Sequence, residues 1–346
     1  MNRFEYLRPN SVSEAVAAGA EPGSAYLAGG TNLLDLMKAG IARPTRLVDV
    51  TRLPGLDRIE RCADGALRIG ALVRNATLAH DQDFVRSYPS VAEALLSGAS
   101  AQLRNAATVG GNIMQRSRHV FHAALASVSD APAIDASEED GRYSAVLGWS
   151  KACSAVHPSD FCVPLVALDA KVEIEGNTGR REVSLENFYH LPEDSPEIAT
   201  VLQPGDLITA VILPTRAGTF SPNTSYLKLR ERTSYAFALV SAVACLDIED
   251  GKIAEARIAL GGVAPKPWRA RSAEDLLKGE VPGEAAFRRA ANVALADARP
   301  SRDNAFKIEL SRRVVLRVLL SAANGSPQRL PPLPSSPFST TPGVHQ

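Results

Sequence analysis

The chain has 346 residues with 38 Lys and Arg against 38 Asp and Glu, so its formal net charge is +0, and no overall field attracts nucleic acid or an anionic membrane surface. A hydrophobic fraction of 45% with 22% charged residues predicts a folded globular protein of about two domains and excludes a disordered chain. The four cysteines include no C-x-x-C pair, which argues against a disulfide framework and against a zinc or thiol-exchange site of that type.

The sequence predicts no membrane insertion. Its longest apolar stretch, Ala236–Leu246, is interrupted by Ser241 and falls far short of the roughly 20 residues that cross a bilayer. The opening MNRFEYLRPN carries charges and a proline where a signal peptide has its apolar segment. We therefore expect a cytoplasmic chain by default, and a periplasmic one if it is exported together with a signal-bearing partner.

Residues 1–56 predict a small α/β lobe with the order strand, helix, strand, helix, strand. Ser11–Glu14 forms a capping box in front of the first predicted helix. A strand at Tyr26–Ala28 leads directly into the turn residues Gly29–Asn32, and Leu33–Ala39 then has a helical pattern. The second strand of this lobe is therefore expected to end in a glycine turn at a helix N-terminus.

Residues 57–221 predict a second lobe that mixes both element types. Strands are predicted at Leu67–Ala71, Lys171–Glu175 and Leu207–Leu213, and helices at Thr77–His80, Ser90–Ser97 and Ser159–Leu168. Pro214 closes the last strand, because proline cannot donate to a sheet ladder. The acidic stretch Ser127–Arg142 lacks apolar periodicity and predicts a surface loop.

Residues 222–323 predict a third lobe, an antiparallel sheet backed by helices. Apolar and polar residues alternate through the predicted strands Asn223–Arg230, Ala236–Ile248 and Ile253–Leu260. Asp250–Gly251 is typical of a hairpin turn. Helices are predicted at Ala273–Lys278, Glu284–Ala298 and Asp303–Ala322. The Pro- and Ser-rich tail, residues 324–346, is expected to be disordered.

Three short motifs have the residue types of a nucleotide site. Gly29–Gly30 and Gly110–Gly111 each allow close backbone approach to a ligand, and the N–H groups that follow can bind phosphate. In His157–Asp160 the carboxylate can accept from a sugar hydroxyl. Each glycine motif alone is better explained as a tight turn or a bend, and His157–Asp160 alone as a helix cap. Neither glycine pair matches G-x-G-x-x-G or G-x-x-x-x-G-K-[ST], which disfavours a dinucleotide-binding Rossmann domain and a P-loop.

The three motifs together, in this order and at this separation, identify a protein family far more specifically than any one of them alone. The segments that matter are YLAGGTNLLDLMK (26–38), ATVGGNIMQR (107–116), HPSD (157–160) and YLKLRERTSYAFALV (226–240). They resemble the FAD-binding medium subunits of the molybdenum hydroxylases, the xanthine dehydrogenase and carbon monoxide dehydrogenase family, and above all the flavin subunits of periplasmic aldehyde oxidoreductases. The resemblance runs from about Phe4 to Leu320 and leaves out the tail and the stretch 117–142.

The resemblance implies an α/β (α+β) fold, a two-lobed FAD-binding domain of the vanillyl-alcohol-oxidase type (also called PCMH-type) plus a C-terminal antiparallel sheet with helices. It implies that FAD is held by Tyr26, Leu27, Ala28, Gly29, Gly30, Thr31, Asn32, Leu33, Thr108, Gly110, Gly111, Asn112, Asp160 and Lys228. The first glycine loop would cradle the pyrophosphate and the second would hold it from the other lobe. Asp160 would lie along the cofactor, and Lys228 would reach the flavin from the third lobe and stabilise its anionic reduced form. An exposed strand lysine is the alternative for Lys228.

The sequence departs from those relatives that carry an additional iron–sulfur cluster. Where they have cysteines, this chain has His119 and Ala131, and only Cys153 stays in register. Because a [4Fe–4S] cluster generally needs four thiolates, we expect none in this chain. A new metal site from His119, His122, Cys153 and His157 has the required ligand count but no sequence evidence that the two pairs converge. Arg116 and Arg118 are expected to line a surface or a partner contact rather than a catalytic site, and simple solvation of both is the alternative.

The leading functional hypothesis is an oxidoreductase component, the electron-transfer flavoprotein of a heterotrimeric molybdenum hydroxylase. The chain is too short for a molybdopterin domain and lacks the C-x4-C-x2-C spacing of a [2Fe–2S] centre, so a molybdopterin-binding large subunit and a [2Fe–2S] small subunit are the implied partners. No catalytic residue of its own is expected. The substrate oxidised by the partner and the external electron acceptor are not determined by the sequence. Two alternatives are a stand-alone flavoenzyme, similar to the UDP-N-acetylenolpyruvoylglucosamine reductases, and a flavin-free interaction protein.

Overall fold

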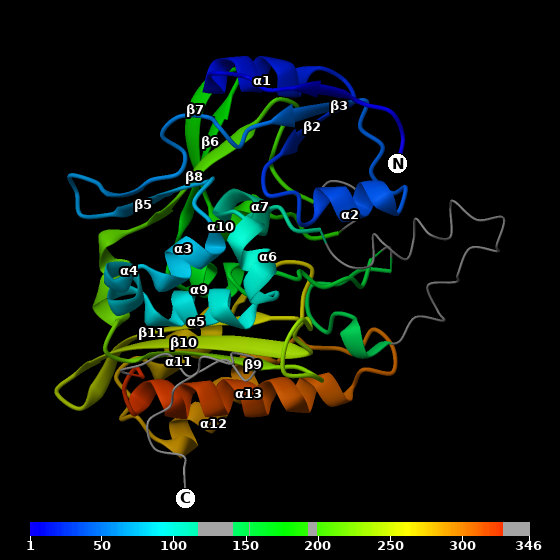
Figure 1. Cartoon of the computed structure of the whole chain (residues 1–346). Helices are drawn as coiled ribbons and strands as arrows, with labels where there is room; N and C mark the ends of the chain where they lie inside the picture. Colours follow the sequence, from blue (N-terminus) through cyan, green and yellow to red (C-terminus); the bar gives the residue numbers. More distant parts are fainter. Residues whose placement is uncertain (117–140, 152, 193–198, 328–346) are drawn as a thin grey trace, which may run out of the picture.

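The computed structural model describes residues 1–116, 141–151, 153–192 and 199–327. Most of the predicted loop 127–142 and of the predicted tail 324–346 lies outside this part of the chain. Figure 1 shows the third sheet in the lower half of the view with helices α12 and α13 beneath it, and the strands of the other two sheets above it. No helix in the described residues is both long enough and apolar enough to cross a membrane.

The first sheet confirms the predicted N-terminal α/β pattern. Its parallel strands have the order β1 (Glu5–Leu7), β3 (Arg46–Asp49), β2 (Ser24–Leu27), with α1 (Val12–Ala20) and α2 (Leu33–Lys38) between them in sequence. The predicted N-cap is confirmed, because the Ser11 hydroxyl accepts from Glu14 N at 3.2 Å. The Glu14 carboxylate reaches back as in a capping box, but it accepts from Asn10 N at 2.8 Å, one residue before the N-cap. These bonds satisfy backbone donors that the start of α1 would otherwise leave unpaired.

The second sheet is antiparallel and has five strands in the order β4-β5-β8-β6-β7. Their bounds are β4 (Ile59–Arg61), β5 (Leu67–Gly70), β6 (Lys171–Gly176), β7 (Gly179–Ser184) and β8 (Leu207–Leu213). The strands predicted at 67–71, 171–175 and 207–213 are therefore confirmed. The central strand β8 is buried along most of its length, which is why its sequence reads as a continuous apolar run.

Short helices separate the second sheet from the third. They are α3 (Asn75–His80), α4 (Gln82–Ser87), α5 (Pro89–Ser97), α6 (Ala101–Ala106), α7 (Val109–Ile113), α9 (Cys162–Ala167) and α10 (Leu185–Phe188). Val91 of α5 and Leu165 of α9 share one apolar core with Ile69 of the second sheet and Val243 of the third. Because α5 contributes to both sheets' packing, the position of its C-terminal end relative to both lobes is fixed.

The third sheet has the antiparallel order β12-β11-β10-β9. Its strands are β9 (Thr224–Leu229), β10 (Val240–Glu249), β11 (Lys252–Gly261) and β12 (Trp268–Arg269), and its outer face carries α11 (Arg271–Leu277), α12 (Glu284–Ala294) and α13 (Phe306–Ala323). The predicted hairpin is confirmed, with φ +49° at Asp250 and +74° at Gly251. Helix α12 ends four residues before the predicted Ala298, in the turns that precede Pro300. Short 3-10 helices occupy Gly141–Tyr143 and Thr215–Phe220.

Residues 144–147 and His157 pack against the third lobe, although their place in the chain falls within 57–221. Val146 N and Leu147 N both donate to Val263 O, at 2.8 and 3.0 Å. The buried Lys307 of α13 donates to Ser144 O at 2.8 Å and to Gly262 O at 2.7 Å. The segment that leads into His157–Asp160 is thus anchored on the C-terminal sheet and its helices.

Candidate functional site

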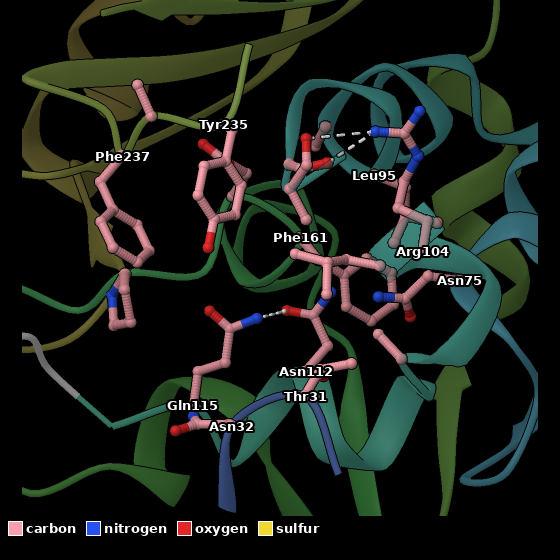
Figure 2. A pocket seen from close by; sticks show the side chains of 18 of the residues that line it. Thr31, Asn32, Asn75, Leu95, Arg104, Asn112, Gln115, Phe161, Tyr235 and Phe237 are labelled. Atoms are coloured by element: carbon pink, nitrogen blue, oxygen red, sulfur yellow. Dashed lines mark hydrogen bonds between the residues drawn. The ribbon is translucent and has the colours of Figure 1, made fainter. Parts of the chain in front are cut away.

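The three motifs converge on one cavity of about 720 Å³, a size typical of small-molecule and cofactor sites. Its wall takes residues from every lobe: the start of α2, the ends of α5 and α6, the segment after α7, and the loop between β9 and β10. Figure 2 shows Thr31, Asn32, Asn112 and Gln115 along one side of this space and Tyr235 and Phe237 beside them. Segments far apart in sequence therefore build a single site.

Of the predicted cofactor residues, Thr31, Asn32, Asn112, Asp160 and Lys228 line the cavity. The remaining ones, Tyr26, Leu27, Ala28, Gly29, Gly30, Leu33, Thr108, Gly110 and Gly111, are not among its lining residues. The glycines among them and Thr108 belong to the two loops whose backbone positions the residues of the cavity wall.

The first glycine loop lies directly on the backbone of the second lobe. A Cβ placed on Gly29 would be 2.1 Å from Ala106 O and 3.1 Å from Ala107 Cα, so no side chain fits between the two loops. Gly30 has φ +73°, a left-handed conformation that glycine adopts without strain. The Asn32 side chain makes no capping bond to α2, which leaves its amide available at the cavity wall.

The structure does not bring Tyr26 into the cavity. Its hydroxyl donates to Gly205 O at 2.8 Å and Ala15 O at 3.2 Å, tying the first lobe to the turn before β8. Burial raises the pKa of Tyr26, which keeps its hydroxyl protonated and able to donate. The Tyr26 side chain thus joins the two lobes, and its predicted contribution to the cofactor site stays a prediction.

The second glycine loop is shaped by its own hydroxyl and by β5. Thr108 Oγ1 accepts from Gly111 N at 3.2 Å, and Gly110 N donates to Ala71 O at 2.8 Å. A Cβ on Gly110 would be 3.0 Å from Ala71 Cβ, so this glycine allows the loop to pack closely against the end of β5. The loop then directs Asn112 to the cavity.

Asn112 connects the second motif to the third. Its Oδ1 accepts from Ser159 Oγ at 2.7 Å and from Gln115 Nε2 at 3.1 Å (Figure 2). Ser159 Oγ also accepts from Cys162 N, the first amide of α9, at 3.3 Å, although the N-cap position of that helix is Phe161 and not the predicted Ser159 or Asp160. Motif residues 47 positions apart in the chain are in this way held in one hydrogen-bonded group.

Lys228 is not an exposed strand lysine. Its ammonium donates to Asp160 Oδ2 at 2.7 Å and to Ser97 O at 3.1 Å, and the two side chains are only 3% and 7% exposed. Asp160 Oδ1 accepts from Tyr226 Oη at 2.6 Å. Lys228 therefore lines the cavity as predicted, but its charge is already paired with that of Asp160.

The alternative metal site from His119, His122, Cys153 and His157 lies only partly within the described residues. No group of three or more His, Cys, Asp or Glu side chains there could hold an ion. His157 is buried against the Tyr189 ring, with centroids 4.5 Å apart, and burial lowers its pKa to about 3. His119, His122, Arg118 and Ala131 lie outside the described residues.

Sequence reasoning missed much of the cavity wall. Arg104 and Asn75 are single polar residues in helical patterns, without a glycine or a proline to mark them, and Leu95, Tyr235 and Phe237 look like ordinary core or strand residues. Arg116, which was expected on a surface or at a partner contact, also lines the cavity. Only one sequence feature could have indicated any of these lining residues: Arg104 and Arg116 lie close in sequence to the second glycine loop.

The Glu93 side chain of α5 binds the backbone of Tyr226, whose hydroxyl contacts Asp160. Its Oε2 accepts from Tyr226 N at 2.9 Å, and burial raises its pKa to about 7. The folded chain thus keeps a proton that the unfolded chain releases above about pH 4.5. The contribution of Glu93 to stability is therefore lost as the pH rises from about 4.5 to 7.

A Glu93→Gln variant is expected to lose this pH dependence while still accepting the Tyr226 bond. Between pH 5 and pH 8 the free energy of unfolding of the wild type should fall by about 3 kcal/mol more than that of the variant. Urea unfolding at the two pH values measures this difference. The exposed Glu249→Gln serves as the control and should follow the wild type. An identical pH profile for Glu93→Gln and wild type would contradict a protonated Glu93.

Comparison with known proteins gives a consistent result over nearly the whole chain. The family described as the FAD binding domain in molybdopterin dehydrogenase matches residues 2–216, and the CO dehydrogenase flavoprotein C-terminal domain matches residues 225–322. The aldehyde oxidoreductase FAD-binding subunit PaoB of Escherichia coli (strain K12) is 44% identical over 93% of this chain and 99% of its own length. The carbon monoxide dehydrogenase medium chain of Hydrogenophaga pseudoflava is 28% identical over 92% of this chain and 97% of its own.

Solved structures agree with the sequence relatives. A chain of carbon monoxide dehydrogenase from Hydrogenophaga pseudoflava superposes with a TM-score of 0.74 at 27% identity, covering 93% of this chain and 98% of that one. A chain of quinoline 2-oxidoreductase from Pseudomonas putida 86 gives a TM-score of 0.73 at 25% identity with the same coverage. The expected fold is thereby confirmed.

Proposed function

The chain belongs to the FAD-binding medium subunits of the molybdenum hydroxylase family, and from this membership we propose that it carries electrons from a partner iron–sulfur subunit to an external acceptor. The partners in this proposal are a molybdopterin-binding large subunit and a [2Fe–2S] small subunit. We propose an aldehyde as the substrate class of the assembled enzyme, supported by the 44% identity to an aldehyde oxidoreductase subunit over almost its full length. The compartment follows from the partners, cytoplasmic by default and periplasmic if a signal-bearing partner exports the complex.

The observation that carries the proposal is the convergence of both glycine loops and Asp160 at one cavity. The residues present suit FAD. The cavity volume is adequate for a large cofactor, and the Thr31 hydroxyl and the Asn32 and Asn112 amides line its wall. When bound, FAD supplies a centre that takes up electrons singly and releases them singly or in pairs.

The chain's own residues position the cofactor rather than react with a substrate. A stand-alone reductase of this fold needs an acid or base aimed at its substrate. The buried carboxylate of the cavity, Asp160, is already engaged by Lys228 and Tyr226. Because Asp160 is engaged in this way, it favours the hypothesis of an electron-transfer subunit over that of a stand-alone flavoenzyme. The presence of the cavity favours both of these hypotheses over that of a flavin-free interaction protein.

Purification of the full chain tests the proposal directly. We expect the visible absorption bands of flavin at one FAD per chain, with neither iron nor labile sulfide on elemental analysis. Co-purification with the partner subunits should then allow substrate to reduce this flavin. A colourless chain would exclude the flavoprotein function, and stoichiometric iron near four atoms per chain would show a [4Fe–4S] cluster held by residues other than those considered.

A further inference from the structure

Lys307 of α13 is a lysine buried without a counter-charge. It is 0% exposed, and its amine donates to two backbone carbonyls, Ser144 O at 2.8 Å and Gly262 O at 2.7 Å. Among the described residues the amine has no further acceptor and no carboxylate partner. Burial alone lowers the pKa of Lys307 from 10.5 to about 7, because no neighbouring charge offsets the lost hydration. The proposed electron transfer makes no use of this amine.

The two acceptor carbonyls belong to segments that border the cavity. Ser144 directly follows Tyr143, which lines the cavity wall. Gly262 has φ +71°, and a Cβ on it would be 2.9 Å from Ala238 O, so its loop lies against the chain next to Phe237, another lining residue. Figure 1 shows the orange start of α13 beside the green chain that precedes Ser144. A change in the bonding of these carbonyls therefore affects the position of the cavity wall.

The elements packed around Lys307 supply no charge that acts on its pKa. The loop Gly261–Ala264, the start of β10 (Val240–Ala244) and the last turn of α12 (Ala291–Ala294) contain no titratable residue. The titratable residues next to Ser144, in the loop before α13 and in the first turn of α13 are Arg142, Tyr143, Arg299, Arg302, Asp303 and Glu309. Of these, Arg142 pairs with Glu231 and Glu309 with Arg313. Protonation of Lys307 therefore adds a buried charge that remains uncompensated.

We propose that Lys307 is a pH-sensitive anchor, which holds residues 144–147 on the loop Gly261–Ala264 as a neutral amine and lets them open to solvent when it is protonated. A neutral amine has two N–H donors, matching the two carbonyls, whereas an ammonium ion has three. In the open state the amine is hydrated and regains its ordinary pKa of 10.5. Closing therefore releases a proton, and the closed state loses stability as the pH falls from about 10.5 to 7 and changes no further below 7.

Hydrogen exchange of the full chain between about pH 6 and pH 9 tests the anchor. Val146 N and Leu147 N donate to Val263 O, so both amides are protected while residues 144–147 are closed. After correction for the intrinsic effect of pH on exchange, their opening constant should rise by about tenfold for each unit of pH decrease from 9 to 7 and level off below 7. The amides of β8, in another lobe, should keep a higher protection and report global unfolding.

Two variants assign the effect to the amine. Lys307→Gln keeps two N–H donors but cannot titrate, and its opening constant should be independent of pH. Lys278→Met replaces an exposed lysine and should follow the wild type. Glu93 cannot imitate the effect, because its titration destabilises the chain as the pH rises.

A wild-type opening constant for Val146 and Leu147 that is the same at pH 9 and pH 7 would overturn the proposal. So would an unchanged pH dependence in Lys307→Gln. The wild-type series needs no variant, so it decides the question even if Lys307→Gln does not fold.

Discussion

A Gly29→Val variant is expected to fold but to purify without FAD. The new Cβ would be 2.1 Å from Ala106 O and 2.8 Å from Ala106 C, and both are backbone atoms that cannot rotate away. The first glycine loop would have to separate from the second lobe and would take Thr31 and Asn32 out of the cavity wall. Losing two hydrogen bonds to a charged group, at about 1.5 kcal/mol each, weakens binding roughly a hundredfold.

Flavin absorbance per chain after gel filtration measures this effect. Gly218→Val is the matched control, because a Cβ there meets nothing within 4 Å, and it should retain wild-type FAD content. Gly30→Val is expected to give an intermediate loss. Its φ of +73° strains valine, but the nearest atom, 2.8 Å away, is the flexible end of Leu34. Full FAD content in Gly29→Val would show that the close approach of the two loops is not needed for binding.

Lys228→Met is expected to lower the free energy of unfolding by about 3–5 kcal/mol, the usual cost of leaving a buried charge without its partner. The Lys228 and Asp160 side chains are 3% and 7% exposed and 2.7 Å apart. Without the ammonium, Asp160 keeps only its bond from Tyr226. The change should be visible in urea denaturation of the flavin-free chain at pH 7.

Two further variants establish whether the cost comes from the buried pair. Adding Asp160→Asn to Lys228→Met removes the unpaired charge and should restore most of the stability. Lys171→Met breaks a surface pair with Glu182, whose side chains are 53% and 44% exposed, and should cost less than about 1 kcal/mol. If Lys228→Met proves as mild as Lys171→Met, the carboxylate is accommodated without its lysine, and the pair does not hold the cavity wall.

The sequence by itself determined most of the local structure. The apolar run Leu207–Leu213 ends at a proline, and the structure has β8 over the same residues. The hairpin at Asp250–Gly251 and the N-cap at Ser11 are also where the pattern placed them. Each of these features depends on residues close together in the chain, whose backbone preferences act before any long-range packing. The order of the glycine motifs was likewise enough to identify the family.

Only the tertiary structure decided which side chains the cavity contains and what they do there. Lys228 meets Asp160 across 68 residues of chain, and Gly29 meets Ala106 across the lobe boundary. Asn75 and Arg104 come to one wall because α3 and α6 are packed together between the sheets. No local sequence pattern predicts such long-range contacts, because they are fixed by the free energy of burying the whole hydrophobic core. A single polar residue in a helical pattern becomes a binding residue only where that packing leaves an enclosed space beside it.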